Sequence, residues 1–189
     1  MKYIFILFLM CLSPAVMAQD NSPIEVTADN ALEWDRANSI FRADGNAIIT
    51  QGDSMISAPN VTAYYKDTDN GIEIQKVTAK TNATLKQPGQ TLTAKTVDAV
   101  FKDGVLSEII ATNNVVLKTK TETLYGDKAN YDAINRKVVV TGNVKIEQDN
   151  NVLTGNRAEF DLKTNISTLT SSPQSGGRVK AVFYNKGNE

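Results

Sequence analysis

Residues 45–65 read GNAIITQGDSMISAPNVTAYY, and this stretch decides the fold of the chain. Apolar and polar residues alternate along it, break off at a polar turn around Gly52, and alternate again in a run that opens with small residues. Alternation with a period of two is typical of a strand with one buried face. Glycine and aspartate in the break tolerate turn dihedrals. The stretch therefore predicts a β-hairpin.

The same layout returns three more times, which makes the chain a degenerate repeat. Each unit is interpreted as a hairpin followed by a connection, and each unit's first residue is followed by an asparagine. The units start at Gly45, Thr81, Asn113 and Gly142. Their predicted hairpin turns are Gln51-Gly52-Asp53-Ser54, Gln87-Pro88-Gly89-Gln90, Thr119-Lys120-Thr121-Glu122 and Gln148-Asp149-Asn150-Asn151.

The second run of each unit changes its alternation partway along. Ala58 and Val61 are both expected to point inward, although an odd spacing separates them. A β-bulge or a bend between the two residues would re-aim the side chains in this way. The equivalent inward pairs are Ala94 and Val97, Gly126 and Ala129, and Gly155 and Ala158.

The flanks of the repeat extend the β pattern. Residues 23–34 resemble the second half of a unit, so the fold is expected to begin with a half-unit, and residues 178–184 alternate as a last edge strand. No convincing i, i+3, i+4, i+7 apolar stripe predicts a helix. We expect an all-β sandwich, roll or solenoid. It forms one domain over residues 19–184, followed by a flexible tail at residues 185–189.

The first 18 residues are typical of a secretory signal peptide. Lys2 is followed by a short apolar run and then by small residues that end at Ala18. The apolar run is shorter than the ~20 residues that span a bilayer, which disfavours an uncleaved membrane anchor. We expect cleavage after Ala18 and an exported mature protein.

The composition excludes several classes of protein. The 189 residues carry a net charge of −1, whereas a nucleic-acid-binding protein normally needs a basic face. The chain has no histidine, and its one cysteine, Cys11, lies in the predicted signal peptide. Catalytic triads, Cys-His pairs and histidine or thiolate zinc sites are therefore impossible in the mature chain. Asp98, Asp103 and Glu108 show no spacing that singles out a catalytic pair, so we expect neither an enzyme nor a cofactor.

Small residues at many inward positions leave two interpretations open. Alanines such as Ala47, Ala63 and Ala99 pack two facing sheets closely in many proteins. Alternatively, they leave an apolar trough partly empty for an acyl chain. The edge strands at residues 24–28 and 178–184 also leave two interpretations open. They either pair with the edges of other copies, which stack head to tail into a filament, or remain exposed to solvent.

Three segments of the chain resemble the organic-solvent-tolerance (OstA-like) repeat family: PIEV at residues 23–26, GNAIITQG at residues 45–52 and ISA at residues 56–58. The resemblance implies a twisted, open β-jellyroll in the periplasm whose apolar interior holds the acyl chains of lipopolysaccharide. It also implies head-to-tail stacking of copies between an LptC-like inner-membrane protein and an LptD-like outer-membrane translocon. The lipid-contacting positions that it implies are Ile24, Val26, Ile49, Leu85, Val97, Phe101 and Leu117.

Two other functions stay open at this point. A membrane-anchored, LptC-like transport component would share the fold, but the predicted cleavage site speaks against it. A ligand-free, secreted structural repeat protein would share the alternation, but it would have no need for small inward residues. Lys86 and Lys118 occupy the same repeat position and are candidates for contacting lipid phosphates, although outward lysines are usually only solvated.

Overall fold

The computed structural model describes residues 22–69, 71–171 and 177–184. Within these ranges the regular elements are β-strands, so the predicted all-β fold class is confirmed. No helix long and apolar enough to cross a membrane occurs in this part of the chain. The predicted signal peptide and the predicted tail lie outside the described residues. The strands are β1 (Glu25–Thr27), β2 (Ala31–Asp35), β3 (Ile40–Gln51), β4 (Ser54–Thr68), β5 (Gly71–Gln87), β6 (Gln90–Lys102), β7 (Val105–Thr119), β8 (Glu122–Asp132), β9 (Lys137–Gln148), β10 (Asn151–Asp161), β11 (Ile166–Thr170) and β12 (Lys180–Val182).

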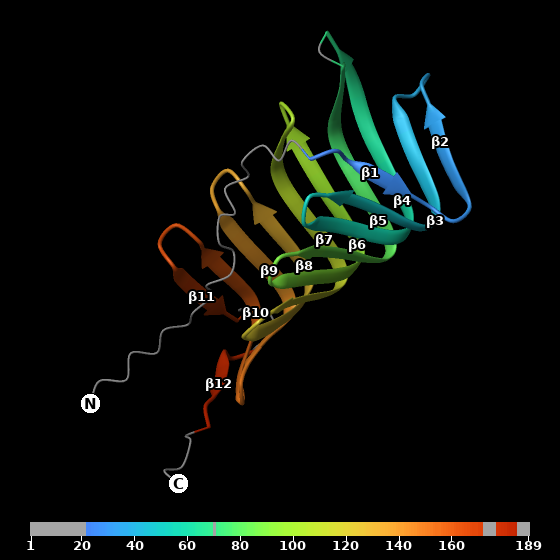
Figure 1. Ribbon diagram of the computed structural model, residues 1–189. Helices are drawn as coiled ribbons and strands as arrows, with labels where there is room; N and C mark the ends of the chain where they lie inside the picture. The colour runs from blue at the N-terminus through green and yellow to red at the C-terminus, as the bar shows by residue number, and fades with distance from the viewer. Residues whose placement is uncertain (1–21, 70, 172–176, 185–189) are drawn as a thin grey trace.

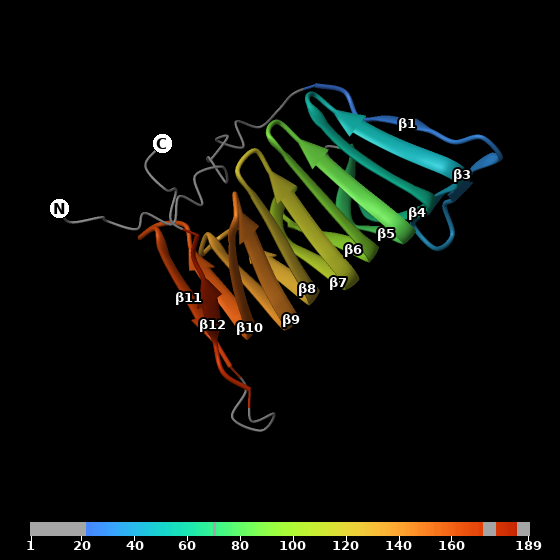
Figure 2. The ribbon, with the colours of Figure 1, turned by 90° about the horizontal axis from the view of Figure 1, so that it is seen from below.

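The strands form one 12-stranded antiparallel sheet, in which each strand from β3 to β10 pairs with the next along the chain. Figure 1 shows the long strands bending partway along their length, so the sheet has two arms. We term the arm with the predicted hairpin turns the hairpin arm, and the other one the return arm. Figure 2 shows the strands side by side, from β3 near one end to β10, β11 and β12 at the other. The sheet does not close on itself, which is the open β-jellyroll that the family resemblance implied.

Two short strands, one on each arm, lie at each end of the sheet. β1 pairs with the hairpin-arm part of β3, and β2 pairs with its return-arm part. At the other end, β12 pairs with the hairpin-arm part of β10, and β11 pairs with its return-arm part. The predicted initial half-unit and the predicted last strand are both confirmed. Strand β11 was not predicted.

The bend between the arms comes from pairs of residues in the left-handed region of backbone space. Thr81 and Asn82 have φ values of 67° and 57°, and their neighbours on either side lose the regular strand register there. Two successive positive φ angles turn the strand sharply, and asparagine tolerates them better than most residues. The bend was predicted on the second run, between Ala58 and Val61, and both of these residues are buried there. The left-handed pairs, however, lie on the strand that pairs with this run, at the first two residues of each repeat unit. The bending pairs are Gly45-Asn46, Thr81-Asn82, Asn113-Asn114 and Gly142-Asn143.

The four predicted hairpin turns lie where expected, but the predicted connections between hairpins are wrong. The segment between the first two hairpins belongs to β4 and β5, which continue as paired strands as far as Thr68 and Gly71. A bulge explains why the strand signal was missed. Tyr64 pairs with Lys76 and Tyr65 with Ile74, so Gln75 is unpaired and the alternation on β5 changes phase there. Ser107 interrupts the pairing of β6 and β7 in the same way.

Candidate functional site

A continuous row of aliphatic side chains crosses the whole hairpin arm. Its members are directly paired from strand to strand, so neighbouring Cβ atoms lie about 5 Å apart. All but the last are branched aliphatic residues, and most are partly buried. The aliphatic row consists of Val26, Ile49, Ile56, Leu85, Leu92, Leu117, Leu124, Ile146, Leu153 and Ala181.

The return arm carries a corresponding row of smaller side chains. Alanine and valine dominate it, and its central members are almost fully buried; Ala79, for example, is 0% exposed. A sheet with small side chains allows the other arm or a ligand to approach its backbone closely. The return row consists of Leu32, Ala43, Val61, Ala79, Val97, Ala111, Ala129, Val140, Ala158 and Leu169.

The buried core divides into two clusters along the sheet. The first, from Ala43 to Val115, contains only alanine and valine, and larger side chains such as Ile49, Ile56 and Leu92 pack against it while staying partly exposed. The second consists of Leu124, Val138, Val140, Val144, Ile146, Ala158 and Phe160. The first cluster thus consists of small side chains, whereas the second includes larger ones such as Leu124, Ile146 and Phe160.

The structure brings four of the seven predicted lining residues together. Val26, Ile49, Leu85 and Leu117 all belong to the aliphatic row. The same repeat position in the fourth unit is Ile146, and the paired position on each partner strand is an isoleucine or leucine that the predicted set omitted. That signal was present in the sequence, because these omitted residues recur at one offset. They are Ile56, Leu92, Leu124 and Leu153.

The remaining three predicted residues lie elsewhere. Val97 belongs to the return row and is only 2% exposed, so it packs inside the small-residue core. Phe101 pairs with Leu106 near the return-arm turns and packs against the same core. Ile24 precedes β1 at the end of the sheet and is 54% exposed.

A row of polar side chains lies beside the aliphatic row, next to the hairpin turns. Each member is two residues from a member of the aliphatic row on the same strand, so both face the same side of the sheet. Within it, Gln90 donates a hydrogen bond from Nε2 to Oε1 of Gln87 at 2.8 Å. The polar rim consists of Gln51, Ser54, Gln87, Gln90, Thr119, Glu122, Gln148 and Asn151.

Glu122 is the only charged residue of the polar rim, and it is only 5% exposed. Its Oε1 has no hydrogen-bond partner within the described part of the chain. Burial raises the pKa of the Glu122 carboxyl above its ordinary value, because desolvation disfavours the charged form. Nothing in the sequence indicates this burial, because Glu122 belongs to a predicted polar turn.

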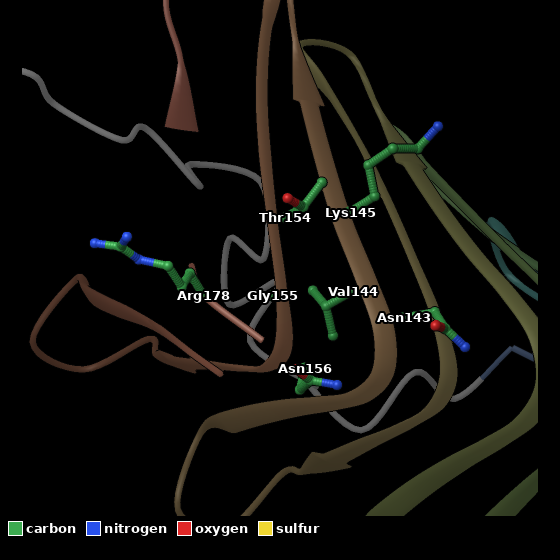
Figure 3. Close-up of a pocket in the computed structure, with 7 residues that line it drawn as sticks. All are labelled: Asn143, Val144, Lys145, Thr154, Gly155, Asn156 and Arg178. Atoms are coloured by element: carbon green, nitrogen blue, oxygen red, sulfur yellow. The ribbon is translucent and has the colours of Figure 1, made fainter. Parts of the chain in front are cut away.

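A shallow pocket on β9 and β10 is lined by polar and basic residues, but its cations do not converge. Figure 3 shows Lys145 and Arg178 pointing away from each other. Lys145 Nζ is already 2.9 Å from Glu147 Oε1 and lies over the Tyr125 ring. The pocket therefore does not form an anion site. Its lining residues are Asn143, Val144, Lys145, Thr154, Gly155, Asn156 and Arg178.

Other charged groups are also poorly placed for chemistry. Lys86 and Lys118 both lie on the outward side of the hairpin arm, because they alternate with inward-facing members of the aliphatic row. In the described residues no group of three or more acidic or thiol side chains is arranged to hold a metal ion. The arrangement is suited to binding apolar chains, with polar contacts along one rim.

A known protein family matches most of the chain. The sequence profile of the family described as "LptA/(LptD N-terminal domain) LPS transport protein" matches residues 25–166. A comparison with curated proteins returned no match. Matching solved structures include the crystal structure of LptH, the LptA homologous periplasmic component of the conserved lipopolysaccharide transport device from Pseudomonas aeruginosa. That match has 18% identity and a TM-score of 0.36, and covers 88% of this chain and 98% of the other.

Proposed function

Since the chain belongs to the LptA/LptD N-terminal domain family of LPS transport proteins, we propose that it carries lipopolysaccharide by holding the acyl chains along its aliphatic row. The observation that carries this proposal is the unbroken pairing of branched aliphatics from Val26 to Leu153. Each methylene that leaves water for such a surface contributes about 0.8 kcal/mol, so binding needs no catalytic group. An open sheet also lets the lipid leave again at either end.

The predicted signal peptide supports a periplasmic location for this activity. The sequence has no Gly-x-x-x-x-Gly-Lys-Ser/Thr motif, so energy for directed transport comes from partner proteins. The partners that the family resemblance implies are an LptC-like inner-membrane protein and an LptD-like outer-membrane translocon. The protein then bridges them as copies joined head to tail.

The two ends of the sheet support head-to-tail association. One end exposes Leu32 and Trp34 on β2, and the other exposes Ile166 on β11. Exposed edge strands with apolar side chains pair readily with another chain. Sedimentation of the mature protein should therefore show oligomers that grow with concentration. A protein that stays monomeric at high concentration contradicts this part of the proposal.

Native mass spectrometry with purified lipopolysaccharide tests the binding itself. The protein should form an adduct with intact lipopolysaccharide and none with the deacylated form. Ile49→Asp places a charge in the aliphatic row and should abolish the adduct. The matched control is Ile48→Asp, since Ile48 is on the opposite face of the same strand and is already 37% exposed.

The outcome distinguishes the lipid carrier from the ligand-free structural repeat protein. If wild type is folded and binds no lipopolysaccharide, the structural interpretation is favoured. If Ile49→Asp is folded and binds as wild type does, the aliphatic row is not the lipid site.

A further inference from the structure

Glu122 carries a buried hydrogen-bond acceptor that the fold leaves unused. Its Oε1 is the buried side-chain polar atom without a hydrogen-bond partner in the described residues. None of the ion pairs among these residues includes it. A buried acceptor without a partner destabilises a folded protein. A ligand that supplies a donor would remove this penalty.

The carboxyl is also not needed to build its turn. The Thr119 hydroxyl accepts hydrogen bonds from the backbone N–H groups of Thr121 and Glu122, at 3.3 and 3.1 Å. The same hydroxyl lies 3.3 Å from the backbone carbonyl oxygen of Glu122. The turn is therefore closed by Thr119 and by the backbone, and the Glu122 side chain is available for another role.

The position of Glu122 indicates what kind of group it meets. It lies two residues before Leu124 on β8, so both side chains face the inner side of the hairpin arm. Leu124 belongs to the aliphatic row, whereas the neighbours of Glu122 along the rim, Thr119 and Gln148, are neutral and polar. The polar rim thus lies where the apolar surface of the hairpin arm ends, and Glu122 supplies its one carboxyl group.

We propose that the Glu122 carboxyl accepts a hydrogen bond from the root of a bound acyl chain, where an amide N–H links the chain to the head group or a hydroxyl of the chain lies close to that linkage. This inference rests on the proposed function, because it assumes that acyl chains lie along the aliphatic row. Glu122 then discriminates among lipids: it favours those with a donor at the chain root over those whose chains are joined only by esters. The raised pKa of the carboxyl is compatible with this role, since both its neutral and its charged forms accept hydrogen bonds.

Two lipids and three variants test the inference. The first lipid is lipopolysaccharide, whose glucosamine carries amide-linked hydroxyacyl chains, and the second is dimyristoyl phosphatidic acid, which has a phosphate and ester-linked chains only. Glu122→Leu removes the acceptor, Glu122→Gln keeps an acceptor oxygen, and Glu147→Leu removes an outward carboxylate on the next strand. Dissociation constants for both lipids and the lipid-free melting temperature are measured for each protein.

Glu122→Leu should raise the lipid-free melting temperature, because it replaces an unpartnered polar group with an apolar one. It should weaken lipopolysaccharide binding about tenfold, the effect of one hydrogen bond to such a group, and leave phosphatidic acid binding unchanged. Glu122→Gln and Glu147→Leu should keep the lipopolysaccharide affinity within about twofold.

The inference is overturned if Glu122→Leu binds lipopolysaccharide as wild type does. It is also overturned if that variant loses melting temperature and binds both lipids more weakly, since Glu122 would then be a structural residue. If wild type binds neither lipid, the proposed function itself fails, and this outcome is distinct because it appears without any variant.

Discussion

The first and second halves of the sheet hold the first and the second buried cluster, respectively. Both halves are built from the same kind of bent strand, but their side chains differ. At the small-residue position of the repeat, the first half has Ala58 and Ala94, whereas the second half has Gly126 and Gly155. The neighbours explain the difference. A Cβ atom on Gly126 would lie 2.4 Å from Cγ1 of Val140, and one on Gly155 would lie 2.9 Å from the Leu169 side chain. The neighbouring side chains thus require glycine at this position in the second half, whereas the first half accommodates alanine.

Removing bulk from the second half should have the largest effect. Phe160 is 2% exposed and is the largest of the fully buried side chains among the described residues. Phe160→Ala should lower the free energy of unfolding by about 3–5 kcal/mol, since it removes apolar contacts and leaves a cavity. Val97→Ala, at a buried site of the first half, should cost about 2 kcal/mol, because it removes fewer buried carbon atoms. Urea unfolding measures both, and equal losses would show that the two halves are packed alike.

Adding bulk to the second half should have the next largest effect. Gly126→Ala forces its new methyl group against Val140 and should destabilise the protein by about 1–3 kcal/mol. Gly126 has no positive φ, so the penalty is one of space alone. Combining the change with Val140→Ala should restore part of the loss relative to the sum of the single variants. A double variant whose loss is simply additive would refute the explanation for glycine at this position.

The sequence predicted those features of the fold that depend on residues close together in the chain, and it missed those that depend on other strands. The alternation around Ile49 and Leu85 is local and repeated, so it predicted the hairpin strands, the hairpin turns and four residues of the aliphatic row. The phase changes at Gln75 and Ser107 hid the return-arm parts of β5 and β7, since a bulge breaks the period of two. The burial of Glu122 depends on neighbouring strands, and nothing within its own turn indicates it.

The bends of the repeat units also differ, and relieving one of them should stabilise the protein. Thr81 in the second unit has φ of 67°, whereas the equivalent residues of the first and fourth units are Gly45 and Gly142. A β-branched residue is strained at such an angle, and glycine is not. Thr81→Gly should therefore raise the free energy of unfolding by about 0.5–1 kcal/mol, the left-handed penalty of threonine less the entropy lost by glycine.

The reverse change at the other bend is the control for this prediction. A Cβ atom on Gly142 would lie 2.2 Å from an Asp127 carboxylate oxygen, so Gly142→Thr should be clearly destabilising. Thermal unfolding of the two variants compares them. If Thr81→Gly lowers the melting temperature, the contacts of the threonine side chain stabilise the protein by more than the backbone strain destabilises it.

The last difference between the halves is one of pH dependence. Burial raises the pKa of Glu122, in the second half, above its ordinary value. The unfolded chain therefore loses this proton at a lower pH than the folded chain does. The contribution of the Glu122 carboxyl to the free energy of unfolding is greatest below the ordinary pKa of a glutamate, near pH 4.3. This contribution declines as the pH rises through the higher pKa of the folded state.

Glu122→Gln should abolish that decline, so the stability of the variant relative to wild type should increase as the pH is raised above about 4. Turn aspartates act in the opposite direction in both proteins. Hydrogen bonds from Asn38 to Asp35 and from Asn135 to Asp132 lower the pKa values of these aspartates, so stability from them is lost as the pH falls. Because the aspartates are common to wild type and variant, the difference between the two unfolding curves isolates Glu122. A difference that stays constant from pH 4 to pH 8 would mean that the Glu122 carboxyl titrates alike in the folded and unfolded chains.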